Sequence, residues 1–251
     1  MENANRLPVL YLILGLWAGL SSCRADGPRD IRDFYFPLKA LEDGLVYEYQ
    51  PVGIDSLTPV YWYYRSLIQP GGVYLTGTYY EYDLIPQQLV REELVQNGML
   101  VKDVFLYGPV IDSSGQQART AVEVLEGNAF PFEGADSTGV FLYKIRWAPP
   151  QDSGAVVTLI KNRRYLKDTA VQVLGEERPA ILFDVKELVE YDKNGVFEQA
   201  YGGREIYAEG LGLVYYDKQI GEGLNLKYAL QRRYPMNELE KQYEQIIQTK
   251  E

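Results

Sequence analysis

The residue with the most definite chemistry in this sequence is its single cysteine, Cys23. It directly follows Leu20-Ser21-Ser22, at the end of an apolar stretch from Leu7 to Leu20 that Arg6 precedes. A helix needs about 20 apolar residues to cross a bilayer core of ~30 Å, so this stretch is too short for a stable span and is typical of a signal peptide. Because the chain has no second cysteine, Cys23 cannot form an intrachain disulfide.

The tetrapeptide Leu20-Ser21-Ser22-Cys23 resembles the lipobox of bacterial lipoproteins, in which an aliphatic residue and two small residues precede the cysteine. The resemblance implies that the Cys23 thiol receives a diacylglyceryl group, that the chain is cut before Cys23, and that the new amino terminus is acylated. Two or more acyl chains give stable anchoring, at about 0.8 kcal/mol per buried methylene. An ordinary secretory signal with a chance cysteine is the alternative.

The residue after Cys23 bears on the membrane to which the chain is sent. Arg24 stands there, and not the aspartate that retains lipoproteins at the inner membrane in some bacteria. The resemblance therefore implies the cell envelope, lipid-anchored, at the outer membrane of a Gram-negative bacterium. Which leaflet of the outer membrane carries the domain is left open.

The composition excludes several classes of function. The chain contains no histidine, which removes Ser-His-Asp and Cys-His triads, histidine zinc sites and the commonest general base near neutral pH. Its formal charge of −10 repels phosphate backbones, so we expect no nucleic-acid partner. No nucleophile elbow, Walker loop or Rossmann fingerprint occurs. We expect a protein that is not an enzyme and has no catalytic residue, metal site or cofactor.

Two kinds of charged residue remain to be weighed. A glycan hydrolase needs two carboxylates some 5–10 Å apart, but among so many acids some pair always qualifies, so this is our third hypothesis. The dipeptides Arg163-Arg164 and Arg232-Arg233 are small basic spots. We expect their guanidinium groups to pair with neighbouring acids rather than to mark a phosphate site.

A dense aromatic cluster is formed by Tyr61-Trp62-Tyr63-Tyr64 and Tyr79-Tyr80-Glu81-Tyr82. In a strand, side chains alternate between the two faces, so both faces of the first segment are aromatic. One face is expected in the core, and the other either lines a ligand-binding concavity or lies under another element. The candidate ligand-binding residues are Trp62, Tyr64, Tyr80 and Tyr82.

The elements that must position these residues are strands. Tyrosine occurs 22 times and favours half-buried sheet faces, and the alternation of apolar and polar residues is typical of antiparallel sheets with one buried face. The predicted strands are Gly44–Gln50, Pro59–Ser66, Val73–Asp83, Gln88–Gln96, Met99–Tyr107, Arg119–Leu125, Val140–Ala148, Val156–Leu166, Ala170–Leu174, Ala180–Tyr191, Val196–Tyr201, Glu205–Tyr216 and Leu224–Tyr234.

Turn signals separate these strands, among them Pro70-Gly71-Gly72, Asn97-Gly98, Asn194-Gly195, Gly175–Pro179 and Gly221–Gly223. The sequence therefore predicts a mainly β fold. It is a single antiparallel curved sheet, closed into a barrel or left as a half-barrel, with a sandwich as the alternative. A C-terminal helix is predicted over 237–249, capped by Asn237 and packed on the sheet through Leu239, Tyr243, Ile246 and Ile247.

The predicted domain organisation has three parts. Residues 1–22 form the signal peptide, residues 23–33 the lipidated tether, and residues 34–251 one all-β domain that ends with the helix. The tether is predicted from its charged, aperiodic sequence with Gly27 and Pro28.

Two segments resemble uncharacterised lipoproteins of Bacteroidota. One is Asp33–Lys39 leading into Gly44–Tyr49, with the motif Phe36-Pro37-Leu38, and the other is Gly203–Val214, in which two glycines let the sheet bend. Leu45 stands where a tryptophan is usual in that family. The resemblance implies no activity. Some members look like the curved sheet with a packed helix of LolA/LolB-type carriers, which is an analogy of form alone.

These observations lead to one functional expectation with two alternatives. We expect a membrane-anchored envelope lipoprotein that binds an apolar or amphipathic ligand, a lipid or a glycan, in the concavity of its sheet. The first alternative is a structural or assembly subunit that docks another envelope protein. The second is the carboxylate-dependent glycan hydrolase.

Overall fold

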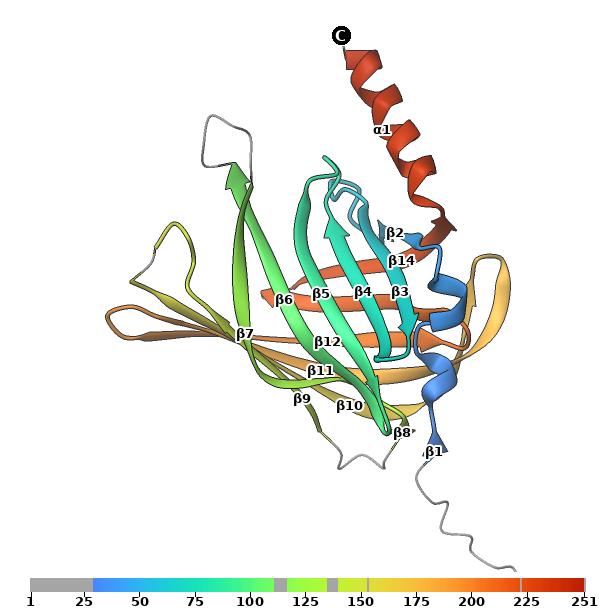
Figure 1. The fold of residues 1–251 in the computed structure, drawn as a ribbon, viewed down its shortest axis with the longest axis horizontal. Coiled ribbons are helices and arrows are strands. Elements are labelled where there is room, and N and C mark those ends of the chain that lie inside the picture. Colours follow the sequence, from blue (N-terminus) through green and yellow to red (C-terminus); the bar gives the residue numbers. More distant parts are fainter. Residues whose placement is uncertain (1–28, 111–116, 135–139, 153, 222, 251) are drawn as a thin grey trace, which may run out of the picture.

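The structure is a computed structural model that describes residues 29–110, 117–134, 140–152, 154–221 and 223–250. In this part of the chain the strands form a closed antiparallel barrel of 12 strands, followed by one α-helix (Figure 1). The predicted mainly β fold with a C-terminal helix is confirmed. Of the shapes left open, the chain adopts the barrel.

The elements follow one another along the chain as β1 (Arg29–Asp30), η1 (Arg32–Phe34), η2 (Leu38–Leu41), β2 (Leu45–Pro51), β3 (Val60–Gln69), β4 (Gly72–Tyr80), β5 (Pro86–Val95), β6 (Gly98–Val110), β7 (Gln117–Pro131), β8 (Glu133–Gly134), β9 (Phe141–Trp147), β10 (Val156–Val173), β11 (Glu176–Asp192), β12 (Val196–Ala208), β13 (Gly212–Gly221), β14 (Leu224–Tyr234) and α1 (Met236–Lys250). The elements η1 and η2 are single turns of 3₁₀-helix.

Most strands of the barrel pair with the strands next to them in sequence. The barrel closes because β14 pairs with β2 and because β9 pairs with both β7 and β10. The short strands β1 and β8 form a separate two-stranded sheet. Such a meander needs only short connections, so local turn residues determine much of its topology.

The alternation read from the sequence matches the two faces of the barrel wall. In β11, Ile181, Phe183 and Val185 are buried in the barrel core, and in β9 Ile145 is buried there. A barrel has no sheet edges, and its interior fills with the inward side chains of every strand. Large aromatic side chains supply much of this filling here, since Tyr47, Tyr49, Phe130 and Phe183 are among the largest fully buried residues.

The expected reversals occur close to the predicted turn residues. The β5–β6 hairpin turns between Val95 and Gly98, and the β11–β12 hairpin between Asp192 and Val196. The β10–β11 hairpin turns at Leu174 and Gly175, whose φ angles are 53° and 84°. Positive φ at both positions is what a two-residue type I′ turn requires. The chain therefore reverses at Leu174, one residue before the predicted turn residues. This leucine adopts a backbone conformation that glycine or asparagine adopts more easily.

Two strand predictions are wrong. The predicted strands Val156–Leu166 and Ala170–Leu174 are one strand, β10, with a register shift between Tyr165 and Lys167. The predicted strand Glu205–Tyr216 is instead split by the β12–β13 turn, while β12 continues through Gly202-Gly203. The sequence places glycines at both positions, and only the packing decides between them. Gly203 packs against the Asp217 carbonyl oxygen in an extended strand, whereas the turn uses glycines at positive φ.

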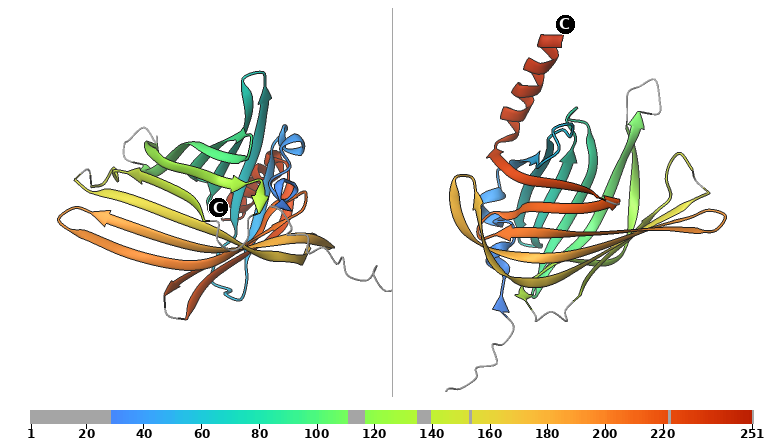
Figure 2. Two further views of the ribbon diagram at one scale, coloured as in Figure 1. Left: turned by 90° about the horizontal axis from the view of Figure 1, so that it is seen from below. Right: turned by 180° about the vertical axis from the view of Figure 1, so that it is seen from behind.

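Residues 31–41 cross the end of the barrel at which β2 begins, and we call this end the plugged end (Figures 1 and 2). The segment is bonded to three separated parts of the wall. The Ile31 N–H donates to the Phe132 carbonyl oxygen at 2.8 Å, and the Asp33 carbonyl oxygen accepts from the Gly210 N–H at 2.9 Å. The Ser66 hydroxyl donates to the carbonyl oxygen of Leu38.

Residues 31–41, which we call the plug, extend the folded domain toward the N-terminus beyond its predicted start. Ile31 has no exposed surface, and Arg29 pairs with Gly134 in the small sheet. Residues 29–33, which we predicted to be part of the tether, therefore belong to the fold. The sequence of this segment is charged except for Ile31, and that one apolar residue is the anchor.

The C-terminal helix forms over nearly the predicted residues but contacts the barrel differently. It begins at Met236, one residue before the predicted cap Asn237, and the Glu238 N–H donates to the Pro235 carbonyl oxygen at 3.0 Å. Leu239 is buried at the barrel wall, Tyr243 is half-buried, and the rest of the helix projects away from the barrel (Figure 1). The side chains of Ile246 and Ile247 lie outside the described residues.

Candidate functional site

The predicted aromatic site is divided between the two faces of the barrel wall. Trp62 and Tyr64 point inward, with ring centres 5.7 Å apart and nearly parallel planes. Tyr80 pairs in register with Tyr61 and shares its outer face, because directly opposite residues of neighbouring strands point to the same side. Tyr82 lies in the turn after β4 and is 59% exposed. The four residues therefore do not line one surface.

Other parts of the chain pack against both faces of this cluster. The Phe36 ring, carried by the plug, lies 4.2 Å from the Tyr64 ring, which is only 7% exposed. On the outer face, Tyr61 and Tyr63 pack against the buried cluster that contains Leu239 of α1. The plug therefore packs against Tyr64 on the inner face, where we expected a concavity, and part of the outer face packs against the cluster that contains Leu239.

Several inward tyrosines serve as structural ties. The Tyr47 hydroxyl donates to the Leu211 carbonyl oxygen at 2.9 Å, and the Tyr49 hydroxyl donates to the Leu213 carbonyl oxygen at 2.8 Å. Burial raises the pKa of Tyr47 to about 12. These hydroxyl groups hold β2 to the residues around the β12–β13 turn. A buried tyrosine usually finds a hydrogen-bond partner for its hydroxyl group in this way.

A network of charged side chains lies inside the barrel. Lys161 Nζ lies 2.6 Å from Glu205 Oε1 and 3.1 Å from Glu187 Oε1, while Arg163 Nε lies 2.7 Å from Glu205 Oε2. Lys218 forms an ion pair with Glu187. Residues of this network line a cavity of about 140 Å³. This volume corresponds to a few water molecules at ~30 Å³ each, which is too small for an acyl chain.

The network keeps both of its glutamates ionised. Burial acts to raise the pKa of Glu205, but the charges of Arg163 and Lys161 outweigh it and lower the pKa to about 2. The pKa of Glu187 is also lowered, because Lys161 and Lys218 outweigh its burial. Each carboxylate has two cationic partners, so the network has the features of a satisfied structural cluster.

A further acid, Glu92, is half-buried beside the plug. Tyr35 of the plug donates its hydroxyl hydrogen to Glu92 Oε2, and burial raises the pKa of Glu92. Hydrolysis of a glycoside needs two carboxyl groups flanking one substrate. Glu92 does not line the cavity that Glu205 lines, so the two buried acids with oppositely shifted pKa values do not face each other across it.

The basic dipeptides follow the predicted pairing with one exception. Arg163 pairs with Glu205, Arg164 Nη2 lies 3.4 Å from Asp184, and Arg232 Nη2 donates to Glu238. Among the described residues, no carboxylate forms an ion pair with Arg233, and its buried Nε has no hydrogen-bond partner. For Arg233 the expectation of an acidic neighbour is wrong.

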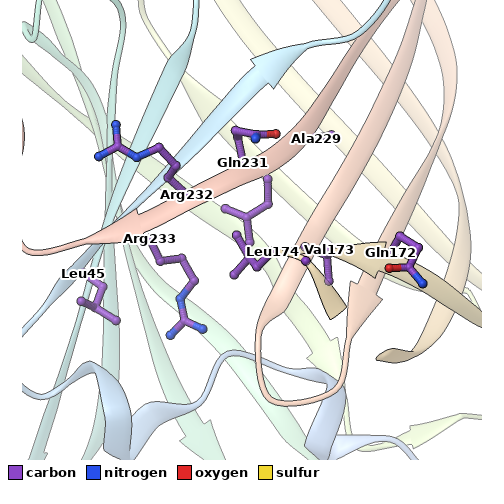
Figure 3. Close-up of a pocket in the computed structure, with 10 residues that line it drawn as sticks. Leu45, Gln172, Val173, Leu174, Ala229, Gln231, Arg232 and Arg233 are labelled. Atoms are coloured by element: carbon purple, nitrogen blue, oxygen red, sulfur yellow. The ribbon is translucent and has the colours of Figure 1, made fainter. Parts of the chain in front are cut away.

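Arg233 borders an open groove of about 820 Å³ at the plugged end of the barrel (Figure 3). The groove lies between the β10–β11 tip and the last residues of β14. Its lining is Leu45, Gln172, Val173, Leu174, Gly175, Ala229, Leu230, Gln231, Arg232 and Arg233. The lining combines apolar residues with two glutamines and two arginines, and it contains no acidic residue, although the chain has 35 acids.

A register shift in β14 turns Arg233 toward the barrel interior. Leu230 pairs with Tyr49 but Arg232 pairs with Glu48, so Gln231 is an extra residue on the β14 side. Bulges of this kind re-aim the side chains that follow them. Regular alternation from the inward Leu230 would send Arg233 outward, whereas the bulge places it opposite the inward Tyr47. A pattern of period two could not reveal this bulge, so the Arg232-Arg233 dipeptide was the one signal available from the sequence.

Other features that bear on function are few in the described residues. Cys23, the predicted lipidation site, lies outside them. Within the described ranges, no group of acids, histidines or cysteines is arranged to hold a metal ion. The helices of this part of the chain include none with the length and apolar character that a membrane span requires.

Comparisons with known proteins reveal a shared fold. No protein-family model matches the chain, and no curated protein matches it by sequence. The crystal structure of a lipoprotein candidate from Parabacteroides distasonis is similar, with 10% identity, a TM-score of 0.50 and coverage of 80% of this chain and 98% of that one. A candidate exported protein with a YmcC-like fold from Bacteroides fragilis has 13% identity, a TM-score of 0.47 and coverage of 80% and 99%. The P. distasonis protein and this chain share their barrel architecture.

Proposed function

We propose that this chain is a lipid-anchored lipoprotein of the cell envelope that binds an amphipathic ligand in the groove at its plugged end. In this proposal Cys23 carries the lipid and the outer membrane is the destination. The observation that carries the proposal is positional. The groove and the point at which the anchored segment joins the barrel lie at the same end of the barrel.

The length of chain between anchor and barrel limits their separation. Arg29 is six residues after Cys23, and an extended chain spans at most about 3.6 Å per residue, or roughly 20 Å in all. Arg29 forms an ion pair with Asp168 on β10, and the same strand ends at Val173 in the groove. A lipid on Cys23 therefore holds the groove end of the barrel close to the bilayer surface, where amphipathic molecules are concentrated.

Two further observations support the envelope location. The Leu20-Ser21-Ser22-Cys23 tetrapeptide has the lipobox pattern. The P. distasonis protein that shares the fold is itself described as a lipoprotein candidate. The groove volume lies within the ~300–1,000 Å³ of sites that bind small molecules, and such sites combine apolar walls with a few polar groups.

Labelling with a palmitate analogue tests the anchor. The full chain would be expressed in a Gram-negative host as wild type, Cys23→Ser and the control Ser22→Ala, which keeps a small residue before the cysteine. We expect wild type and Ser22→Ala to incorporate label and to sediment with membranes, and Cys23→Ser to stay unlabelled. Label in Cys23→Ser, or none in wild type, would refute the anchor.

Native mass spectrometry tests the ligand. The unlipidated form, residues 24–251, contains every described element. After purification from envelope extracts without detergent, we expect it to retain an added mass in the range of a lipid. A bare polypeptide mass after exposure to envelope lipids would contradict the ligand-binding part of the proposal.

A second candidate function, docking of another envelope protein, is favoured by one feature. The β11–β12 hairpin extends from the opposite end of the barrel and exposes 61% of Val196 and 64% of Phe197 at its tip (Figure 1). A photoreactive amino acid placed at Phe197 would capture a docked partner. A discrete protein adduct in membranes would support docking, and its loss when Val196 is changed to Ser would assign the contact to this tip.

A further inference from the structure

The geometry points to an anionic amphiphile as the ligand of the groove. We infer that Arg233 binds a carboxylate or phosphate head group and that Leu45, Val173 and Leu174 contact the acyl chain. This inference rests on the proposed function, because it names the chemical class of the molecule that the same groove holds.

The state of Arg233 is the first argument. An arginine side chain remains charged in proteins. Arg233 is half-buried, and its buried Nε–H has no hydrogen-bond partner, which costs free energy. Arg233 lies over the Tyr47 ring, 4.8 Å from the guanidinium carbon to the ring centre. A cation–π contact satisfies the face of the guanidinium but not its N–H donors. The orphaned Nε and the lack of a described carboxylate partner leave this cation ready to receive an anion.

The charge distribution is the second argument. The chain carries a formal charge of −10, yet the groove contains two arginines and no acid. Arg232 is held on the other face of β14 by Glu238 and by Glu48, whose oxygen is 3.7 Å away. Of the two arginines that line the groove, only Arg233 forms no ion pair with a described residue. The groove is thus a local exception to an anionic protein, with one unpaired cation beside apolar walls.

The conformation of Leu174 is the third argument. Its φ of 53° costs a non-glycine residue free energy that asparagine or glycine would avoid. Leu174 is also 41% exposed at the edge of the groove. A strained, exposed leucine gains nothing from the turn itself, but it extends the apolar wall that Val173 and Leu45 begin. An acyl chain lying on this wall would cover the exposed side chain of Leu174 and the half-buried side chain of Leu45 beside the already buried Val173.

Calorimetric titration of the unlipidated form separates head group from chain. The probes are hexadecanoate, hexadecyl phosphate, hexadecanol and inorganic phosphate, with the amphiphiles below their aggregation concentrations. The variants are Arg233→Gln and the control Arg164→Gln, which removes an exposed arginine of the outer face. We expect both anionic amphiphiles to bind, Arg233→Gln to weaken them about tenfold or more, and Arg164→Gln to change affinity less than about twofold.

The remaining outcomes are decisive in different ways. Hexadecanol binding should be weaker and insensitive to Arg233→Gln, and inorganic phosphate alone should bind weakly.

Binding of hexadecanoate that Arg233→Gln leaves unchanged would overturn the head-group assignment while leaving the groove as a ligand site. Phosphate binding as tight as that of hexadecyl phosphate would overturn the amphiphile in favour of a free anion. No binding of any amphiphile would refute the ligand part of the proposed function, whereas acylation of Cys23 is measured independently.

A second variant keeps the test valid if Arg233→Gln fails to fold. Leu174→Asn suits the positive φ of the turn and removes only the apolar side chain. We expect it to fold, to bind hexadecanoate several-fold more weakly than wild type, and to leave the weak binding of inorganic phosphate unchanged. Equal hexadecanoate affinity in Leu174→Asn and wild type would overturn the placement of the acyl chain.

Discussion

Arg233 and Tyr47 face each other across the β14–β2 pair, with the guanidinium carbon 4.8 Å from the centre of the tyrosine ring. The ring is fixed because the Tyr47 hydroxyl donates to the Leu211 carbonyl oxygen. The contact holds a cation at the inner face of the barrel without using a carboxylate. The structure thereby leaves the Nε–H of Arg233 without a hydrogen-bond partner among the described residues, at the edge of a groove.

The buried Glu205 should dominate the acid sensitivity of the fold. Glu205→Gln leaves Lys161 and Arg163 without their shared carboxylate, so we expect a loss of about 3 kcal/mol in the free energy of unfolding at pH 7. The pKa of Glu205 is about 2 in the folded chain and 4.5 as its ordinary value. Its contribution is therefore complete above about pH 4.5 and disappears as the pH falls through about 2.

Urea denaturation between pH 2 and 7 checks this prediction. The difference between wild type and Glu205→Gln should shrink as the pH falls. The control Glu123→Gln removes an exposed ion pair with Arg146, whose side chains are 56% and 47% exposed, and should change stability by less than about 1 kcal/mol. A pH-independent effect of Glu205→Gln would contradict the ion-pair account.

The β12–β13 turn offers a matched pair of glycines. Gly212 has a φ of 88° and a Cβ there would lie 2.5 Å from the Phe36 ring, whereas Gly210 has a φ of 69° with open space around it. Both alanine variants carry backbone strain, but only Gly212→Ala displaces the plug. We expect losses of about 1 kcal/mol for Gly210→Ala and about 2–5 kcal/mol for Gly212→Ala, measured by urea denaturation. Equal losses would mean that the plug yields freely.

Ile31 tests whether the plug belongs to the cooperative fold. Because Ile31 is completely buried, Ile31→Ala should lower the free energy of unfolding by about 2–5 kcal/mol. Val196→Ala, at a position that is 61% exposed, should change it by less than about 0.5 kcal/mol. Similar small effects of both, in thermal melts followed by circular dichroism, would place the segment in the tether after all.

Leu174 and Leu84 share a positive φ but should respond oppositely to asparagine. Leu84, with a φ of 57°, packs against the buried cluster of Val46, Tyr234 and Leu239, while Leu174 is 41% exposed. Leu174→Asn should maintain or raise the melting temperature, because it relieves strain without a loss of buried packing. Leu84→Asn should lower it. A clear decrease in the melting temperature of Leu174→Asn would show that this leucine stabilises the ligand-free protein.

The sequence predicted the fold well because the barrel is a meander with short connections. The alternation in β9, β11 and β14 and the glycine-containing turns are local signals, and they are sufficient for hairpins. Local signals failed where two neighbouring glycine-containing segments could each form a turn. Gly202-Gly203 and Gly210 both permit a reversal, and the structure uses the second, while Gly203 packs against the backbone of the neighbouring strand β13.

The candidate site was much less predictable. The dense aromatic cluster predicted a site at Trp62 and Tyr64, but Phe36 of the plug packs against Tyr64, and the sequence cannot reveal such a long-range contact. Arg233 was assigned to an acidic neighbour because strand periodicity does not show the bulge at Gln231. Both errors arise from tertiary features that residue type and spacing do not encode.

Photoaffinity labelling with a fatty acid that carries a diazirine in its chain tests the central claim most directly. After irradiation of the unlipidated form, digestion and peptide mass spectrometry would locate the modified residues. The account predicts adducts in residues 172–175 and 229–231, competed by hexadecanoate and reduced in Arg233→Gln. Adducts concentrated around Leu239 on the outer face, or unaffected by hexadecanoate, would contradict it.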